Sequence, residues 1–284
     1  QEAIKAEKIQ QAFGGKIFCG YRNMIESDEV DAVYIPLPPA LHFIWAKAAL
    51  ENHLHVFVEK PSTVSLKDTA ELVRIAEKNS LALYENYMFV LHSQLQEVAD
   101  AVKNGEIGSV RLYRIDFGFP YRGADDFRYK KELGGGALLD CGGYALKYAN
   151  ILLGGKAKVV QADVSYENEQ NVEIFGSGVL KNREGVNVQI AFGMDNEYRC
   201  NIDIWGSRGT LFSSRILTAP DGFVPSYTIT KDGKTKVKQM YSDDAFQKSI
   251  QKFMDCIEYE EERKNSYREM IRQQFLVEEF ARLA

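Results

Sequence analysis

The sequence predicts an α/β protein in two parts: an N-terminal doubly wound parallel sheet, followed by an α+β domain with a large, mostly antiparallel open sheet. Two observations carry this prediction. In residues 1–87, short apolar strands alternate with longer helical segments, which is typical of strand–helix–strand units. After Gly108 the strands become longer and richer in β-branched and aromatic residues, with stretches that alternate between polar and apolar positions.

The first part is expected to begin with a polar helix at 1–13. Further strands are expected at 16–20, 31–35, 55–58 and 81–85, and further helices at 21–30, 41–53 and 65–80. The strands are mostly continuous apolar runs, because strands of a parallel sheet are covered on both faces. One strand–helix–strand unit takes about 30 residues, and the pattern starts in mid-unit, so we expect the first unit of this sheet to lie upstream of Gln1.

Residues 88–284 are assigned to a second domain, for substrate binding and oligomerisation. Strands are expected within 109–119, 157–167, 172–182, 186–193, 199–214 and 226–240, and a C-terminal helix at 246–262. The tetrapeptide KDGK at 231–234 indicates a tight hairpin. Alternation at 187–190 indicates antiparallel strands with one solvated face, so we expect helices on one side of the sheet and an open face on the other.

Composition limits the function classes. Of the 284 residues, 45% are hydrophobic and 26% charged, and the net charge is −5. Lys and Arg are scattered among acids, so nucleic acid is not expected as a partner. Cys19, Cys141, Cys200 and Cys256 stand far apart, which indicates free thiols in a reducing compartment, the cytoplasm. No apolar run approaches the roughly 20 residues that span a bilayer, so no membrane is expected as a partner.

The expected strand at 55–58 ends abruptly in Glu59, Lys60 and Pro61, which are unsuited to continue it. In open parallel sheets, ligands bind beyond the carboxyl ends of the strands. Lys60 would then lie partly desolvated at the mouth of a cleft, with Glu59 beside it. The alternative is an ordinary charged loop after a strand, so from the residues alone Lys60 is one candidate functional group.

A second stretch, GGGALLDCGGY at 134–144, contains three successive glycines. It does not follow a strand of a strand–helix–strand unit, so we expect the glycines to let the chain enter a helix close to a neighbour or a ligand. Asp140, Tyr144 and Lys147 follow at i, i+4 and i+7, on one helix face, so an acid and a phenol can point into one cleft. The alternative is an acid favoured by the helix dipole and a tyrosine packed in the core.

These two blocks resemble the glucose-fructose oxidoreductase / inositol dehydrogenase (Gfo/Idh/MocA) family of NAD(P)-dependent enzymes. The likeness runs from the strand that ends in Glu-Lys-Pro through 82–89, reaches its second block at 133–154 and resumes at 246–262. It is strongest for the sugar-nucleotide ketoreductase and dimeric dihydrodiol dehydrogenase branches. The resemblance implies a Rossmann domain at 1–87, NAD or NADP as cofactor, and a homodimer or homotetramer formed through the open sheet.

The resemblance implies that Lys60, Asp140 and Tyr144 are catalytic. Relatives with a histidine at the position of Tyr144 usually have an aspartate where this chain has Lys147, so the chain is more similar to the branches with a tyrosine. Lys147 suits a phosphate-bearing substrate, although a surface lysine explains it equally well. Tyr144 would be the acid/base, Lys60 its electrostatic partner or the alternative acid, and Asp140 the group that orients Lys60.

Hydride transfer to a carbonyl group requires residues of the types of Lys60 and Tyr144. Hydride reduction of a ketone leaves an alkoxide, which needs a proton donor within reach. A tyrosine with a pKa near 10 holds its proton at neutral pH, and we expect the neighbouring Lys60 ammonium to ease its release.

Further contacts are implied by the resemblance. Those expected at the dinucleotide are Leu37, Pro38, Leu41, His42, Glu59, Lys60, Pro61 and Asn86. Those expected at the substrate are Tyr87, Arg128, Tyr144 and Lys147, with Arg122, Tyr129 and 216–225 as further candidates.

Several of these contacts have a plain alternative. His42 fits equally a residue that caps the helix near it, and the candidates at 122–129 and 216–225 fit flexible surface loops. His53 and His55 lack metal-ligand spacing, so no metal is expected. NAD and NADP are not distinguished, because the diagnostic turn would lie upstream of Gln1.

The expected function is hydride transfer between a nicotinamide and a carbonyl or hydroxyl group of a sugar or sugar nucleotide. Two alternatives stay open: a trans-dihydrodiol dehydrogenase, and a non-catalytic nucleotide-binding regulator on the same fold. Lys60, Asp140 and Tyr144 together favour an enzyme, since a regulator has little reason to keep all three.

Overall fold

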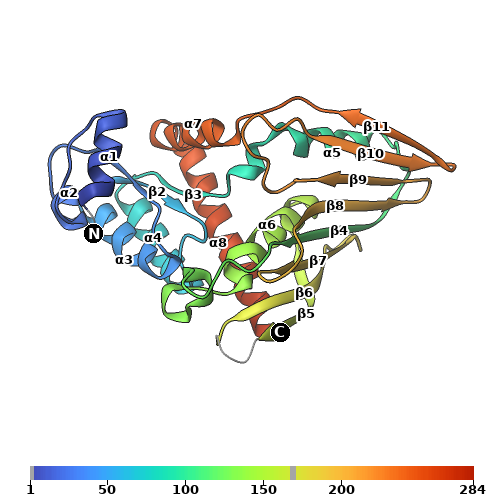
Figure 1. Cartoon of the computed structure of the whole chain (residues 1–284), viewed down its shortest axis with the longest axis horizontal. Coiled ribbons are helices and arrows are strands. Elements are labelled where there is room, and N and C mark those ends of the chain that lie inside the picture. Colours follow the sequence, from blue (N-terminus) through green and yellow to red (C-terminus); the bar gives the residue numbers. More distant parts are fainter. Residues whose placement is uncertain (1–2, 167–170) are drawn as a thin grey trace.

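The computed structural model describes residues 3–166 and 171–284 and contains two sheets (Figure 1). A small parallel sheet with its helices forms one end of the molecule, coloured blue to cyan, and an eight-stranded sheet forms the other. The two-part α/β architecture predicted from the sequence is confirmed.

The small sheet has the strand order β1–β2–β3, with all strands parallel. Its part of the chain comprises α1 (Ala3–Phe13), α2 (Tyr21–Ile25), β1 (Ala32–Ile35), α3 (Pro39–Glu51), β2 (His55–Glu59), α4 (Leu66–Lys78) and β3 (Leu83–Asn86). Val56, Val58 and Leu83 are fully buried, because helices cover the sheet. Since parallel strands end at one edge, the residues that follow β1 and β2 lie side by side.

The prediction of a strand at 16–20 is wrong. These residues pair with no strand in the described part of the chain. Ile17 and Phe18 are only half-buried and line a cavity beside β1. Gly20 follows with φ +95°, outside the strand region. Two large apolar residues between Lys16 and a glycine turn are too few to hold a strand at the sheet edge.

The large sheet has the order β11–β10–β9–β8–β4–β7–β6–β5 and is antiparallel except at the β4–β7 pair. Its strands are β4 (Val110–Gly118), β5 (Lys158–Tyr166), β6 (Glu173–Lys181), β7 (Asn187–Gly193), β8 (Arg199–Gly206), β9 (Thr210–Ser214), β10 (Ser226–Lys231) and β11 (Lys234–Gln239). Glu167, at the end of the strand expected at 157–167, lies outside the described residues, as do the first two residues of the helix expected at 1–13. Asp232 and Gly233 have φ of 52° and 70° and form the expected hairpin turn.

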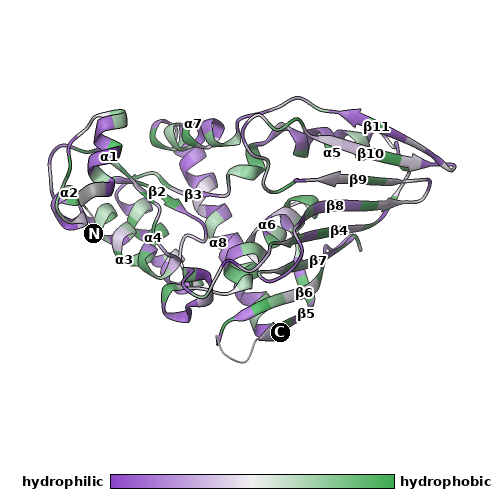
Figure 2. Ribbon diagram, in the orientation of Figure 1, coloured by the Kyte–Doolittle hydropathy of each residue, from purple (hydrophilic) through white to green (hydrophobic). Residues whose placement is uncertain are grey.

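One face of the large sheet is covered and the other is open. α5 (Ser93–Lys103) and α6 (Gly143–Leu152) lie on the covered face (Figure 1), whereas Trp205 and Phe212 on the open face are 62% and 45% exposed. The edge strand β11 is exposed and largely hydrophilic (Figure 2). Its lysines disfavour pairing with another chain.

Two C-terminal helices pack on both parts. On α7 (Ala245–Glu258), Phe253 stacks on Phe57 of β2 with ring centroids 5.3 Å apart. On α8 (Glu260–Leu283), Tyr267 joins the N-terminal core and Phe280 packs on Phe192 of the large sheet. The division into domains at 1–87 and 88–284 stays a prediction, to which the packing adds that α7 and α8 contribute to the N-terminal core.

The helix expected at 246–262 is broken at Tyr259, where the backbone is extended. Glu260, Glu261 and Glu262 form the first turn of α8, a position at which the helix dipole favours acids. Within the described ranges, no helix combines the length and the apolar character needed to cross a membrane.

Candidate active site

A cavity of about 200 Å³ opens where β1 and β2 end. Pro36 follows β1 and Pro61 follows Lys60, and because proline lacks a backbone N–H, both strands stop here. The cavity lies between these strand ends and the segment 127–140. Its lining includes Pro36, Leu37, Glu59, Lys60, Arg128 and Asp140.

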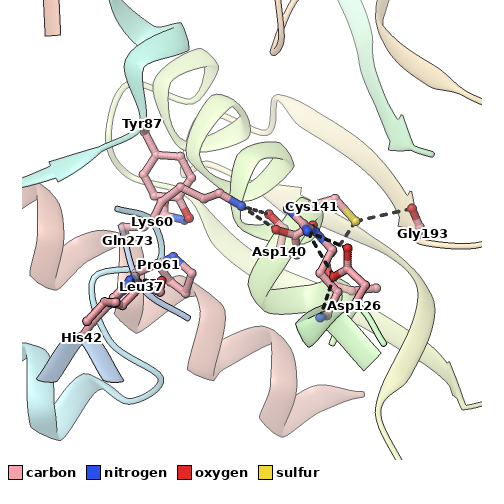
Figure 3. A network of polar contacts seen from close by, with 12 residues as sticks. Leu37, His42, Lys60, Pro61, Tyr87, Asp126, Asp140, Cys141, Gly193 and Gln273 are labelled. Carbon is pink, nitrogen blue, oxygen red and sulfur yellow. Dashed lines mark hydrogen bonds and ion pairs between the residues drawn. The ribbon is translucent and has the colours of Figure 1, made fainter. Parts of the chain in front are cut away.

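Lys60, Asp140 and Arg128 form a buried charge network at this cavity (Figure 3). The Lys60 ammonium donates to Asp140 Oδ1 at 2.7 Å and to the Asp140 carbonyl oxygen at 3.0 Å. Arg128 Nε donates to Asp140 Oδ2 at 2.7 Å, and Nη1 donates to Asp126 Oδ1 at 3.2 Å. The side chains of Lys60 and Asp140 are each 12% exposed. Each oxygen of Asp140 therefore has its own cation, which compensates the burial of its charge.

Tyr144 lies directly against Lys60. The Lys60 ammonium is 4.8 Å from the centroid of the Tyr144 ring. Phe117, Tyr87 and Phe89 surround this ring at centroid distances of 5.2, 5.3 and 5.4 Å. An aromatic wall thus fixes the ring of Tyr144, and the cation lies over its face.

The network keeps its members charged. Burial lowers the pKa of Lys60, but the Asp140 carboxylate and Tyr144 oppose burial, and the net pKa lies above its usual value. Burial raises the pKa of Asp140, but Lys60 and Arg128 lower it, and the net pKa lies below its usual value. At neutral pH the site therefore holds an ammonium against a carboxylate.

The pKa of Tyr144 differs from the expectation. Lys60 lowers this pKa, as predicted, but burial raises it by more, so the net pKa lies above its usual value. The expectation that the phenol releases its proton more easily is therefore wrong for the ligand-free site. The hydroxyl is protonated at neutral pH and can act as a donor.

The glycine-rich stretch brings the chain tightly into this site. A Cβ on Gly135 would lie 2.4 Å from the Arg128 carbonyl oxygen, and one on Gly136 would lie 2.4 Å from Glu173 Oε1. The predicted close approach of these glycines to their neighbours is confirmed. Asp140 follows in a π-helical turn, η4 (Leu138–Gly142), which leads directly into α6. Such turns are frequent at functional sites.

Lys147 does not line this cavity, so its expected contact with the substrate gains no support from the structure. Lys147 Nζ donates to Glu269 Oε2 on α8 at 3.1 Å, and the side chain lines a different cavity. Tyr144 and Lys147 lie three residues apart on the regular helix α6, so their side chains diverge by about 60° around its axis. Asp140 and Tyr144 meet at Lys60, whereas Lys147 faces α8.

Glu59 lines the cavity and is held by two neighbours. The Tyr34 hydroxyl donates to Glu59 Oε1 at 2.6 Å, and Asn86 Nδ2 donates to the same oxygen at 2.7 Å. The other oxygen, Oε2, makes no hydrogen bond among the described residues and can accept from a ribose hydroxyl. The apolar Pro36 and Leu37 line the same cavity. A carboxylate that accepts hydrogen bonds beside apolar side chains fits the nicotinamide riboside end of a dinucleotide. Asn86 supports Glu59 and does not line the cavity.

His42 joins the two strand ends. It is fully buried, with Nδ1 2.8 Å from the Pro61 carbonyl oxygen and Nε2 2.6 Å from the Leu37 carbonyl oxygen. Its partners are carbonyl groups, so it does not cap α3, whose N-cap is Pro38. Burial lowers the pKa of His42, and the two carbonyl contacts only partly oppose this. His42 therefore sets the geometry beneath the cavity, which neither His42 nor Leu41 lines.

Other expected substrate contacts lie elsewhere. Tyr87 is 2% exposed and packs behind Tyr144, accepting a hydrogen bond from Gln273 (Figure 3). Tyr129 is buried, and its hydroxyl donates to the Met194 carbonyl oxygen at 2.7 Å. Neither these residues nor Arg122 nor the stretch 216–225 lines the cavity. Of the expected substrate contacts, Arg128 lines the cavity, whereas Tyr144 lies against Lys60 without lining it.

Sequence reasoning missed three supporting residues. Tyr34 holds Glu59, Asp126 holds Arg128, and Glu85 on β3 accepts from the Ser62 N–H at 2.6 Å. Burial raises the pKa of Glu85. A carboxylate inside the apolar strand 81–85 was the available signal for Glu85, since buried acids need a partner. Tyr34 and Asp126 carried no comparable signal.

Comparison with known proteins agrees with this architecture. The oxidoreductase family with an NAD-binding Rossmann fold matches residues 1–87, and the GFO/IDH/MocA C-terminal domain matches residues 95–212. A dTDP-3,4-didehydro-2,6-dideoxy-alpha-D-glucose 3-reductase of Actinomadura kijaniata is 35% identical over 274 residues, which are 96% of this chain and 82% of that protein. A trans-1,2-dihydrobenzene-1,2-diol dehydrogenase of Danio rerio is 28% identical over 163 residues, which are 57% of this chain and 47% of that protein.

Among solved structures, a 3-ketoreductase from Actinomadura kijaniata in complex with NADP and TDP-benzene has a TM-score of 0.92 at 35% identity. The match covers 96% of this chain and 84% of the other. From the two family matches and this likeness, the chain belongs to the Gfo/Idh/MocA family and is an NAD(P)-dependent oxidoreductase.

Proposed function

We propose that the protein is an NADP-dependent reductase of the C3 ketone of a nucleotide-linked sugar. The observation that carries this proposal is the Lys60–Asp140 pair, 2.7 Å long and placed against the Tyr144 ring at a cavity lined by Glu59. The relatives named above support the substrate class and the choice of NADP. Solved structures of the related ketoreductase include one with a tyrosine replaced by phenylalanine and others with a lysine replaced, the residue types of Tyr144 and Lys60.

The proposed mechanism divides the work between cofactor and chain. The bound dinucleotide supplies or accepts the hydride. Tyr144 donates a proton to the oxygen that becomes the product hydroxyl, and in the oxidative direction it takes that proton back. Lys60 stabilises the negative charge that develops on this oxygen and is the alternative donor.

Asp140 has a positioning role in this proposal. It accepts two hydrogen bonds from Lys60, one at the carboxylate and one at the carbonyl oxygen. An ammonium has three N–H donors, so one stays available for the substrate oxygen. Arg128 fixes Asp140 from the other side and lines the cavity, so we propose that it also contacts the substrate. Leu37, Glu59 and Pro61, with His42 and Asn86 behind them, form the proposed cofactor side.

The protein is proposed to work as a homo-oligomer in the cytoplasm. The open face of the large sheet exposes Val160, Trp205 and Val237 at 55%, 62% and 63%. Large apolar side chains on one uncovered face favour burial against a second copy. Light scattering on the purified protein should give the mass of a dimer or a tetramer, and a monomer at micromolar concentration would contradict this part.

The test of the function is NADPH oxidation, followed optically, with a dTDP-linked 3-keto-sugar. We expect turnover with this substrate, a lower rate with NADH, and loss of the rate in Tyr144→Phe or Lys60→Met. The same protein is assayed for NADP⁺ reduction with a trans-dihydrodiol. Turnover of the diol alone would favour the dihydrodiol dehydrogenase alternative, and cofactor binding without turnover of any substrate would favour the regulator.

A further inference from the structure

A second cavity, of about 630 Å³, lies between α6, α7, α8 and the end of β3. It shares no lining residue with the cavity at Lys60. Tyr84 of β3 lines the cavity on one side. Lys147 of α6 and Arg272 of α8 line it as well. Its volume is in the range of small-molecule sites, about 300–1,000 Å³. The proposed mechanism makes no use of it.

The lining of this cavity is rich in cations. Lys147, Lys252, Arg268 and Arg272 line it, against a single acidic lining residue, Glu269. Three of these cations pair with carboxylates, Lys147 with Glu269, Lys252 with Glu262 and Arg268 with Glu261. The positive charge in excess at the cavity is therefore that of Arg272, and an excess charge in a concave site concentrates ligands of the opposite sign.

Arg272 lacks an anionic partner within the described residues. Its Nε donates to Asn150 Oδ1 at 3.3 Å and its Nη2 donates to the Ala157 carbonyl oxygen, both neutral acceptors. No carboxylate of the described chain lies within ion-pair distance of its guanidinium. Burial lowers the pKa of Arg272, and Glu279 only partly opposes this. The cation is therefore held where an anion would stabilise it.

Lys147 is the most deeply buried cation of the four. It is 8% exposed, and its one described hydrogen bond goes to Glu269, whose side chain is 65% exposed. Lys147 also interacts electrostatically with the buried Glu85, and its single described hydrogen bond leaves two of its three N–H donors free. Lys147 and Arg272 thus present unused donors to one cavity from two helices.

The cavity also has an apolar wall. Val90 and Leu91 contribute to it from the segment after β3, and Ile151 from α6. A ligand with an anionic head and an apolar body would use both sides. A phosphate monoester carries about −1.5 to −2 charges and three acceptor oxygens at neutral pH, which matches several cations better than a single carboxylate does. The guanidinium fork of Arg272 suits phosphate geometry.

We propose that this cavity is a binding site for an organic phosphate monoester, distinct from the active site. The phosphate lies at Arg272, Lys147 and Lys252, and the carbon part lies against Val90 and Ile151. The proposal does not depend on turnover. Binding at this cavity can be absent in an active reductase, and it can be present in a protein that does not reduce the proposed substrate.

Calorimetric titration tests the proposal with phenyl phosphate as the probe and inorganic phosphate beside it. The protein is saturated with NAD⁺, which fills the coenzyme cleft and, unlike NADP, carries no phosphate monoester of its own, and ionic strength is kept low because salt screens charges. We expect one phenyl phosphate per chain, bound more tightly than inorganic phosphate. Lys252→Gln should weaken binding about fivefold or more, since one charge contact to phosphate is lost.

The matched control is Lys264→Gln. Lys264 lies on α8 and pairs with Glu260, as Lys252 pairs with Glu262, but it does not line the cavity. It should bind phenyl phosphate like the wild type. Arg272→Met is a second variant, with its unfolding temperature measured because Arg272 also contacts Asn150. Absence of binding, equal affinity of Lys252→Gln and wild type, or loss of binding in Lys60→Met would overturn the proposal.

Discussion

Lys60 and Asp140 are eighty positions apart in the chain, and the ammonium of one lies 2.7 Å from the carboxylate of the other. Lys60 directly follows β2 of the N-terminal sheet, and Asp140 lies in the π-helical turn before α6. The pair therefore joins the two parts of the molecule at the cavity that we propose as the active site. Because both side chains are largely buried, a change in either one shifts the pKa of the other.

Asp140→Asn tests this coupling. Without the carboxylate, burial is the largest remaining influence on the pKa of Lys60 and lowers it, as Arg128 does, and Tyr144 alone still raises it. Reduction needs the protonated ammonium, so the alkaline limb of the kcat/KM profile should move to lower pH. The rate should fall by about 10²-fold or more, as for loss of a positioned acid–base group.

Asp126→Asn is the control for that variant, since Asp126 contacts Arg128 and not Lys60. It should leave the alkaline limb in place. Removing one partner of a buried pair also destabilises the fold by about 3–5 kcal/mol, so unfolding is measured beside activity. An unshifted alkaline limb in a folded Asp140→Asn protein would separate Lys60 from the reaction.

Tyr144→Phe isolates the hydroxyl from the ring. The phenyl ring keeps its packing against Phe117, Phe89 and Tyr87 and its place beneath Lys60. We expect an unfolding temperature close to that of the wild type and a kcat lower by about 10²–10⁴-fold, the usual contribution of general acid catalysis. An unchanged kcat and pH profile would assign the proton to Lys60, and Lys60→Met would then show the whole loss.

The parallel strand ends were predicted from local patterns, whereas the meeting of Lys60, Asp140 and Tyr144 was implied by the family resemblance. Apolar runs stopped by Glu-Lys-Pro and by prolines locate a sheet edge. The roles of the three residues stay predictions, since geometry does not assign a proton.

The direction in which the Lys147 side chain points was not predictable from the sequence. Spacing at i, i+4 and i+7 marks a broad helix face, and it does not tell which residues of that face reach a cleft and which reach a neighbouring helix. The partner of Lys147 is Glu269, 122 positions away, and only the folded chain brings it near. His42 shows a similar limit, since the apolar Ile44 of α3 is 57% exposed whereas His42 of the same helix is fully buried. Its two carbonyl partners belong to separate loops.

Gly134→Ala tests the close packing of the glycine-rich stretch. Gly134 has φ +78°, and a Cβ there would lie 2.9 Å from Ala40 N, Pro39 Cβ and Val64 Cγ1. Gly222 is the matched control, since it has φ +69° with nothing within 4 Å. Both alanine variants carry the left-handed strain, of about 1–3 kcal/mol. Only Gly134→Ala also pushes the 127–140 segment off α3, so it should lose more stability and more kcat/KM. Equal losses in thermal unfolding and activity would refute the packing argument.

His42 makes stability depend on pH. Its pKa in the folded protein lies below its ordinary value, so between these two values the unfolded chain binds a proton that the folded chain does not. The contribution of His42 is therefore fully present above about pH 6.5 and declines as pH falls from there towards the folded-state pKa. Burial lowers the pKa of His55 and His92 as well, so they add to the same decline.

His42→Gln separates the share of His42 from theirs. Glutamine keeps an N–H donor for one of the two carbonyl oxygens but does not titrate. At pH 8 the neutral imidazole donates to one of the two carbonyl oxygens, as the amide can, so denaturant unfolding should show the variant to be less stable mainly because the amide does not fill the space of the buried ring. Between pH 6.5 and 5 the gap between the two proteins should narrow, since only the wild type is destabilised by proton uptake at His42 in its unfolded state. A gap that stays constant or widens over this range would mean that His42 carries its proton in the folded protein, bridging Leu37 and Pro61 as an imidazolium.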